Sequence, residues 1–159
     1  MRRLHKMRAR SAAQALRGEQ YSCRPVSDAA NLARHAVNAW NAGDLDAFFG
    51  TWDPQIVIRP DPYFPDSEVL VGAEAGRRFV MDQLLFMGSG DLEITEDHDL
   101  GNRSLVRVRQ DVQAPASGVR SSYEWSFVTT ARAGRVVSIE FYIDRERARE
   151  AAGVGDGAE

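Results

Sequence analysis

Residues 39–46, Ala-Trp-Asn-Ala-Gly-Asp-Leu-Asp, end one predicted helix and start another within a short stretch of chain. The first helix is expected to begin at a capping Ser27 or Asp28, because short polar side chains accept hydrogen bonds from the first free N–H groups of a helix. Gly43 then supplies the turn, since glycine readily adopts the left-handed backbone that stops a helix. Asp44 is expected to cap a short second helix. The stretch therefore predicts a tight helix–turn–helix entrance to the fold.

The remainder of the chain is expected to form mainly strands. Apolar residues alternate along it, with turn signals at Gly101-Asn102 and at residues 115–118. The predicted strands are 51–58, 91–100, 103–114, 119–130 and 135–144, with a helix after Gly72 and a charged, helix-competent segment at 145–152. Helices first and a mainly antiparallel sheet afterwards indicate the α+β class.

Length and charge predict one domain with extensions. The 159 residues fit a single core, which we place at 27–152, followed by a flexible tail at 153–159. Residues 1–26 carry seven Lys and Arg against one acidic residue, so we expect a basic, flexible arm. The folded body is correspondingly acidic and should repel nucleic acid. Nucleic acid is therefore not an expected partner, unless the arm itself binds it.

Several classes of site are not expected. Cys23 is the only cysteine, which excludes an internal disulfide and favours a reducing, cytoplasmic location. No apolar run is long enough to span a membrane. The histidines at 5, 35 and 98 lack metal-ligand spacing, and the glycines form no phosphate-binding loop. We therefore expect no metal, no cofactor and no membrane association.

Strand alternation assigns side chains to the two faces of the sheet. Leu92 and Ile94 place Glu96 and His98 on the covered face with them, and the valines of the next strand place Gln110 there. This requires a three-residue loop at 101–103 rather than a two-residue turn at Gly101-Asn102. The loop would also set Asp97 opposite Arg107, whereas the tighter turn would set Glu96 there.

The candidate catalytic residues are His98, Glu96 and Asp61. Imidazole titrates near neutral pH, and a carboxylate at Glu96 would raise the pKa of His98 and select its tautomer, as general base catalysis requires. Asp61 lies on a proline-rich loop with Tyr63, where a carboxylate and a phenol could reach a bound carbonyl or hydroxyl. Alternatively, His98 is a polar strand-end residue and Asp61 an ordinary turn residue.

The ligand-binding candidates line the same predicted face. Tyr63 and Gln110 would orient a substrate, and Trp40, Trp125, Phe127 and Phe141 would form an apolar wall. Residues 137, 139, 141 and 143 share this inward face. The other face carries Arg107, Arg109, Leu105, Glu140 and Tyr142, which predict either a homodimer interface or a solvated surface.

Three short segments carry a resemblance that covers residues 28–152. They are Asn41 to Asp46, Gly72 with Arg77 and Phe79, and Gly134 to Ser138. In these the chain resembles the ketosteroid-isomerase-like and SnoaL-like polyketide cyclase families of the nuclear transport factor 2-like superfamily. The resemblance implies a cone-shaped α+β fold, in which N-terminal helices pack on a strongly curved antiparallel or mixed sheet. It also implies a dimer and one pocket for a small apolar organic ligand.

The residues that carry ketosteroid isomerisation are not matched. The position of the oxyanion tyrosine holds Ala36, and that of the second donor holds Trp125 or Ser126. The base falls near Arg59, although a short shift would bring Asp61 there. We therefore expect a cofactor-independent cyclase, isomerase or hydrolase that is not a ketosteroid isomerase. The alternatives are a non-catalytic small-molecule binding or sensing protein and an interaction scaffold that binds anions through the arm.

Overall fold

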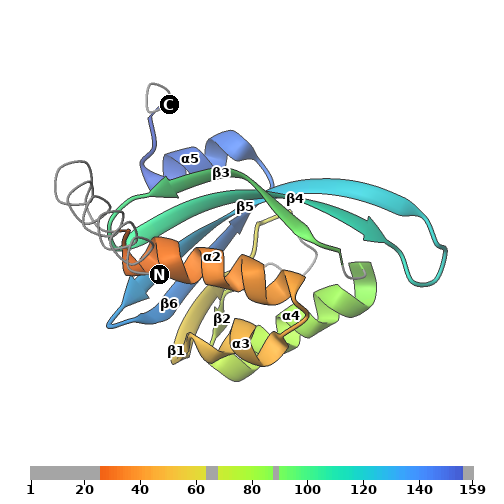
Figure 1. The fold of residues 1–159 in the computed structure, drawn as a ribbon, viewed down its shortest axis with the longest axis horizontal. Helices are drawn as coiled ribbons and strands as arrows, with labels where there is room; N and C mark the ends of the chain where they lie inside the picture. Colours follow the sequence, from red (N-terminus) through yellow and green to blue (C-terminus); the bar gives the residue numbers. More distant parts are fainter. Residues whose placement is uncertain (1–25, 64–67, 88–89, 156–159) are drawn as a thin grey trace, which may run out of the picture.

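The computed structural model describes residues 26–63, 68–87 and 90–155, and the predicted basic arm therefore lies almost wholly outside the described residues (Figure 1). The elements in chain order are α2 (Asp28–Asn41), α3 (Leu45–Gly50), β1 (Trp52–Arg59), β2 (Leu70–Val71), α4 (Ala73–Met87), β3 (Leu92–Asp99), β4 (Arg103–Gln113), β5 (Arg120–Arg132), β6 (Arg135–Tyr142) and α5 (Arg145–Ala152). No helix among the described residues is long and apolar enough to cross a membrane.

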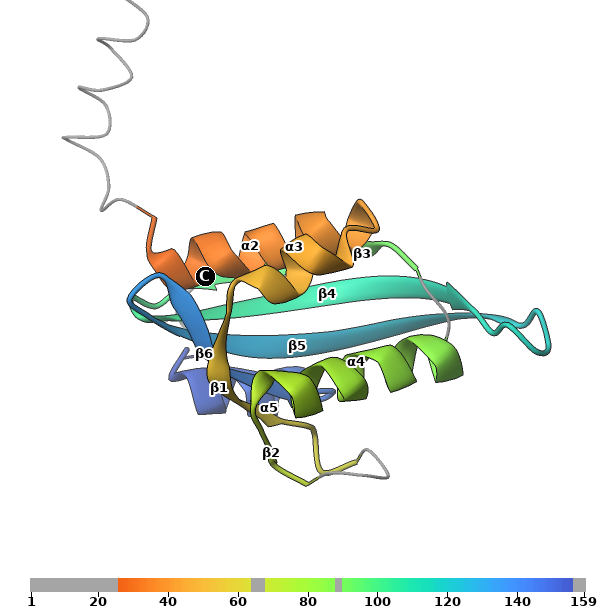
Figure 2. The ribbon, with the colours of Figure 1, turned by 90° about the horizontal axis from the view of Figure 1, so that it is seen from below.

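One six-stranded mixed sheet organises the molecule, in the order β2-β1-β6-β5-β4-β3. β1 runs parallel to β6, and every other neighbouring pair is antiparallel. The sheet does not close into a barrel. Helices α2, α3 and α4 lie on one side of it and α5 on the other (Figure 1). Figure 2 shows the molecule from the side of these three helices. In this view β4 and β5 are visible behind them, with α2 and α3 above the two strands and α4 below. The predicted α+β class and cone-like arrangement are confirmed.

The entrance motif forms as predicted. The Ser27 hydroxyl accepts a hydrogen bond from Ala30 N at 3.2 Å, and Asp44 caps α3 by accepting from Ala47 N at 3.0 Å. Gly43 has a φ of +71°, in the left-handed region that favours glycine. These caps allow α3 to follow α2 after only three connecting residues, 42–44.

Asn41 ties the end of α2 to the sheet. Its amide nitrogen donates to Leu92 O at 2.9 Å, and its oxygen accepts from Leu92 N at 2.7 Å. The side chain thereby imitates a neighbouring strand at the start of β3 and satisfies two backbone groups. This anchor positions α2 across the sheet face that it covers.

The β3–β4 connection differs from the prediction. Leu100 N donates to Arg103 O at 2.9 Å, so the turn has two residues, Gly101 and Asn102, and the expected three-residue loop is wrong. Asp97 consequently pairs with Val106, and Glu96 lies opposite Arg107. The Asp97 carboxylate instead accepts from Arg34 Nε at 2.7 Å.

A bulge in β3 then changes which side chains share a face. The register shifts between Ile94 and Glu96, so that Thr95 is the extra residue. Leu92 and Ile94 pair with Gln110 and Val108 on the face covered by α2, as predicted. On the far side of the bulge the alternation is reversed, because one inserted residue turns every later side chain to the opposite face.

A second bulge has the same effect in β6. The pairing shifts between Thr130 and Ala131, and Val136 rather than Val137 is buried and lies opposite Ala131. Ile139 and Phe141 keep the predicted inward face. The inward placement of Val137 is therefore wrong, and a neighbouring valine takes its place.

Helix α5 covers part of the outer face. Leu105 and Val128 pack with Ala148, Ala152 and Val154 in a core of their own, with Tyr142 at its margin. Glu140 and Tyr142 lie outward as predicted, and the Tyr142 hydroxyl donates to Glu140. Leu105 is buried under α5, so the prediction that it contributes to a dimer interface is wrong.

Candidate functional site

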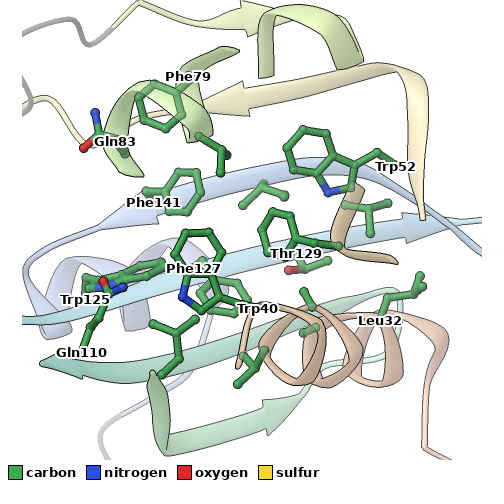
Figure 3. Close-up of a pocket in the computed structure, with 18 of the residues that line it drawn as sticks. Leu32, Trp40, Trp52, Phe79, Gln83, Gln110, Trp125, Phe127, Thr129 and Phe141 are labelled. Atoms are coloured by element: carbon green, nitrogen blue, oxygen red, sulfur yellow. The ribbon is translucent and has the colours of Figure 1, made fainter. Parts of the chain in front are cut away.

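A cavity of about 270 Å³ lies between the helices α2 to α4 and the sheet face that they cover (Figure 3). Aromatic side chains from both sides form most of its wall: Trp40, Phe48, Trp52, Phe79, Trp125, Phe127 and Phe141. All three tryptophans of the chain are among them. The arrangement suits a flat apolar molecule, because aromatic faces and edges pack against other rings.

The rings at one end of the cavity contact each other directly. The centroid of Trp125 lies 5.6 Å from that of Phe127 and 5.6 Å from that of Phe141. Phe141 in turn lies 6.1 Å from Phe79 of α4, so the sheet and the helix meet through aromatic contacts (Figure 3). Such packing leaves each ring little freedom to move, and the wall is held in shape before a ligand enters.

A few polar groups interrupt this wall. They are Thr51, Gln83, Gln110, Tyr123 and Thr129. Glu124 also borders the cavity, but it occupies an outer-face position of β5 and its carboxylate lies 4.0 Å from Arg107 Nη2. Among the described lining residues, the side chains on the cavity face are therefore neutral at pH 7.

Two of these polar side chains, Gln83 and Gln110, are carboxamides, and Gln110 is the more deeply buried of the two. It is 7 % exposed, and its Nε2 donates to Gly90 O at 3.1 Å. Gly90 O also accepts from Trp40 Nε1 at 2.9 Å. One carbonyl of the segment before β3 thereby holds two cavity residues in place.

The structure places five of the six predicted ligand-binding residues on the cavity wall: Trp40, Gln110, Trp125, Phe127 and Phe141. Ligand binding by them stays a prediction. Tyr63 is the exception. Its side chain is 73 % exposed outside the cavity, where the Arg147 guanidinium lies 5.8 Å from the ring centroid.

The three predicted catalytic residues do not line the cavity. Asp61 is fully buried, and its oxygens accept from Tyr63 N at 2.9 Å and Ile143 N at 2.8 Å. It thus ties the loop after β1 to the end of β6. Both oxygens are occupied by backbone donors, which is the arrangement of a structural carboxylate rather than of a base facing a substrate.

The inward placement of His98 and Glu96 is wrong. Beyond the Thr95 bulge both side chains lie on the face of α5, where His98 pairs with Leu105. Glu96 accepts from Arg145 Nε at 2.7 Å and from Arg149 Nη1 at 3.2 Å. The hydrogen bond from Arg145 is the main cause that lowers the pKa of Glu96 below its ordinary value.

His98 and Glu96 do remain neighbours, although not in the cavity. His98 Nε2 lies 3.9 Å from Glu96 Oε1 and is buried without a hydrogen-bond partner among the described residues. With two arginines beside the same carboxylate, the group is an ion-pair cluster that fastens α5 to β3. Among the described residues, no group of three or more His, Cys, Asp or Glu could hold a metal ion.

The sequence analysis missed several wall residues, including Trp52, Phe48, Gln83 and Thr129. Thr129 follows Trp125 and Phe127 with strict alternation in β5, so the same parity argument could have found it. Gln83 comes from α4 one turn after Phe79, on the same side of the helix. Both were overlooked because polar residues carry no hydrophobic signal of their own.

Comparison with known proteins identifies what the chain resembles. The profile of the family described as "SnoaL-like domain" matches residues 33–139. No curated protein matches the chain. A candidate SnoaL-like polyketide cyclase from Jannaschia sp. CCS1 has a similar structure, with a TM-score of 0.67, 14% identity, and coverage of 84% of this chain and 98% of that one.

Two further solved structures share the fold. AclR, a candidate hydroxylase from Streptomyces galilaeus, has a TM-score of 0.64, 17% identity, and coverage of 82% of this chain and 88% of its own. TerC, co-crystallised with polyporic acid, has a TM-score of 0.64, 15% identity, and coverage of 80% of this chain and 99% of its own. At these identities the likeness shows the fold and not the activity.

Proposed function

Because the chain belongs to the SnoaL-like domain family, which matches residues 33–139, we propose that it binds a flat, mostly apolar small molecule in the cavity. One observation carries this proposal. The described wall consists almost entirely of aromatic and aliphatic side chains, with a few neutral polar groups. Ligand sites are typically concave and apolar, with a small number of polar groups that orient the ligand.

The size of the cavity favours a ligand of one or two rings. Its volume of about 270 Å³ lies near the lower end, about 300 Å³, that is common for small-molecule sites. The fold neighbour TerC was co-crystallised with polyporic acid, which supports an organic ligand for a cavity of this architecture. Trp40 of α2 and Trp125 of β5 would contact such a ligand from the helix layer and from the sheet.

The geometry favours binding or sensing over acid–base catalysis. A general base must approach the proton that it removes to about 2.6–3.2 Å, directly or through one water. His98 and Glu96 lie on the other side of the sheet, and Asp61 is occupied by two backbone donors. The cyclase, isomerase or hydrolase expected from the sequence would therefore need another proton acceptor.

Intrinsic tryptophan fluorescence provides a direct test, since all three tryptophans line the cavity. We expect 2-naphthol to quench this fluorescence saturably. Ala36→Phe should abolish the quenching, because Ala36 lines the cavity and the added ring occupies it. Ala42→Phe, at the exposed end of α2, is the matched control and should bind as the wild type does. A wild-type titration without saturable quenching would contradict the proposal.

A second experiment distinguishes a binding protein from an enzyme. The protein is incubated with 2-naphthol and with any organic compound that co-purifies, and the recovered molecules are compared by mass spectrometry with samples kept without protein. A binding protein returns each compound with its mass and retention time unchanged. A product that forms only with wild-type protein, and not with Ala36→Phe, would instead identify an enzyme.

We also propose a homodimer through the part of the outer sheet face that α5 leaves exposed. Arg109, Asp111 and Glu124 are more than half exposed there and carry both charge signs. A twofold interface places the same surface on both subunits, so mixed charges can complement each other across it. A cytoplasmic location, expected from the single cysteine, likewise stays a prediction.

A further inference from the structure

In the carboxamide of Gln110, the nitrogen has a hydrogen-bond partner among the described residues and the oxygen has none. Its nitrogen is assigned by chemistry, since Gly90 O, 3.1 Å away, can only accept a hydrogen bond. The carbonyl oxygen, Oε1, receives no hydrogen bond from any described residue. The side chain cannot simply rotate to exchange its two ends, because that would place an oxygen against Gly90 O.

This free acceptor sits in apolar surroundings. Gln110 is 7 % exposed and lies on the cavity face of β4, between Val108 and Val112 in the alternation of the strand. Oε1 is not one of the buried side-chain atoms without a partner among the described residues, so it is accessible from the cavity. A bound ligand would exclude water from this oxygen, and a polar atom left without a partner is costly. A ligand that presents an O–H or N–H group would therefore bind more tightly than one of the same shape that lacks it.

We propose that Gln110 selects ligands whose flat apolar body carries a hydroxyl or N–H donor, which hydrogen-bonds Gln110 Oε1. This specificity rests on the proposed function of the cavity as a ligand site. Gln110 pairs across the sheet with Tyr123, which is 44 % exposed. The donor end of the ligand would accordingly lie toward the Tyr123 end of the cavity, with the rings extending between Trp125 and α2.

Thr129, another polar residue of the cavity wall, does not compete for this role. Thr129 and Ser104 pair with each other, six residues from Gln110 along β4. At about 3.3 Å per residue this is roughly 20 Å, too far for a two-ring ligand to reach both ends. A threonine hydroxyl also rotates and can donate or accept, whereas the Gln110 oxygen is a fixed acceptor.

Gln110 can be replaced without leaving Gly90 O unsatisfied. Trp40 Nε1 also donates to that carbonyl, at 2.9 Å, and remains when the carboxamide is removed. Gln110→Leu should therefore fold and keep an apolar cavity. Gln113→Leu is a matched control, because Gln113 lies on the same strand, is exposed, and also donates to a backbone carbonyl, that of Gly118.

The test compares two probes by tryptophan quenching: 2-naphthol, which has a hydroxyl donor, and 2-methoxynaphthalene, which has the same rings and oxygen but no donor. The wild type and Gln113→Leu should prefer 2-naphthol by about tenfold in Kd. In Gln110→Leu this preference should disappear, through weaker binding of 2-naphthol and unchanged or tighter binding of 2-methoxynaphthalene. Circular dichroism and unfolding in urea establish that each variant is folded.

The outcomes distinguish this inference from the proposed function. If both probes bind the wild type equally, or if Gln110→Leu keeps the preference for 2-naphthol, the role of Gln110 is refuted while the cavity remains a ligand site. If neither probe quenches the wild type, the proposed function fails, and the inference fails with it. If Gln110→Leu binds neither probe, Gln110 shapes the cavity rather than selecting a donor. That result would also refute the proposed role of Gln110.

Discussion

Asp61 joins two segments that are far apart in sequence. Its side chain is fully buried, and each carboxylate oxygen accepts a backbone N–H, one from Tyr63 and one from Ile143. Because backbone donors buried without a partner are costly, the carboxylate stabilises both the loop after β1 and the end of β6. Its role in the described structure is therefore architectural.

Asp61→Asn tests this role at a single residue. Asparagine keeps one acceptor oxygen but turns an NH₂ group toward the second backbone N–H, so we expect a loss of about 1–3 kcal/mol in the free energy of unfolding. Asp53→Asn is the control, since Asp53 is less buried and, within the described part of the chain, accepts only from Gln55 N. Its effect should stay within about 0.5 kcal/mol. Urea unfolding measures both. Equal stability of Asp61→Asn and wild type would argue against the structural role.

Helix α5 is held to the sheet by an ion-pair cluster as well as by its apolar face. Arg149 is only 4 % exposed and donates to Glu96 Oε1 and to Gly155 O. Arg145 donates to Glu96 from the first turn of the helix, and His98 lies on the same side of β3. Removal of the Glu96 charge would leave Arg149 buried beside His98 without its counterion.

Glu96→Gln should therefore lower stability, and the effect should depend on pH. The folded-state pKa of Glu96 is lowered from 4.5, chiefly by the hydrogen bond from Arg145, so its stabilisation is fully present above pH 4.5. It is lost as the pH falls through the lower folded-state pKa. We expect a difference from wild type of about 3 kcal/mol at pH 7, which shrinks progressively below pH 4.5.

Urea unfolding at several pH values between 7 and 3 measures this difference. Glu146→Gln is the matched control, because Glu146 also pairs with Arg145, at 3.4 Å, but is largely exposed. An exposed pair of this kind contributes about 0–1 kcal/mol. A wild-type-to-Glu96→Gln difference that stayed constant across this range would show that charge at Glu96 does not hold α5.

The molecule as a whole has two unlike faces. One sheet face and three helices enclose the apolar cavity. The other face carries α5 (Figure 1) and, beside it, an exposed polar region on β4 and β5. Arg109 lies in that region, where it donates to Ser122 Oγ at 3.1 Å and lies 3.5 Å from Asp111. Any association through this surface would be polar, and therefore weak and dependent on salt.

Light scattering coupled to size-exclusion chromatography tests the proposed dimer. The wild type should shift toward the dimer mass as its concentration rises, and more so at low salt. Arg109→Glu should favour the monomer, and the double variant Arg109→Glu with Glu124→Arg should restore part of the association. Arg132→Glu, at the opposite end of β5, changes the net charge by the same amount and should leave the association as in the wild type. A wild type that stays monomeric at every concentration would contradict the dimer.

The amino-acid sequence by itself determined the local features of this protein. Ser27, Gly43 and Asp44 set the helix boundaries through short-range capping and backbone preference. Uninterrupted alternation in β4 and β5 placed Gln110, Trp125 and Phe127 on one face, because side-chain direction there follows from chain position alone. The α+β class follows from the order of these elements.

Only the tertiary structure decided where His98, Glu96 and Asp61 point. The Thr95 bulge, and the choice of a two-residue turn at Gly101 over a three-residue loop, appear only in the pairing of β3 with β4. Asp61 likewise finds its second partner in Ile143, far along the chain. A single extra residue in a strand moves the side chains that follow it from the cavity face to the opposite face. The positions of the candidate catalytic residues could therefore not be predicted from their spacing alone.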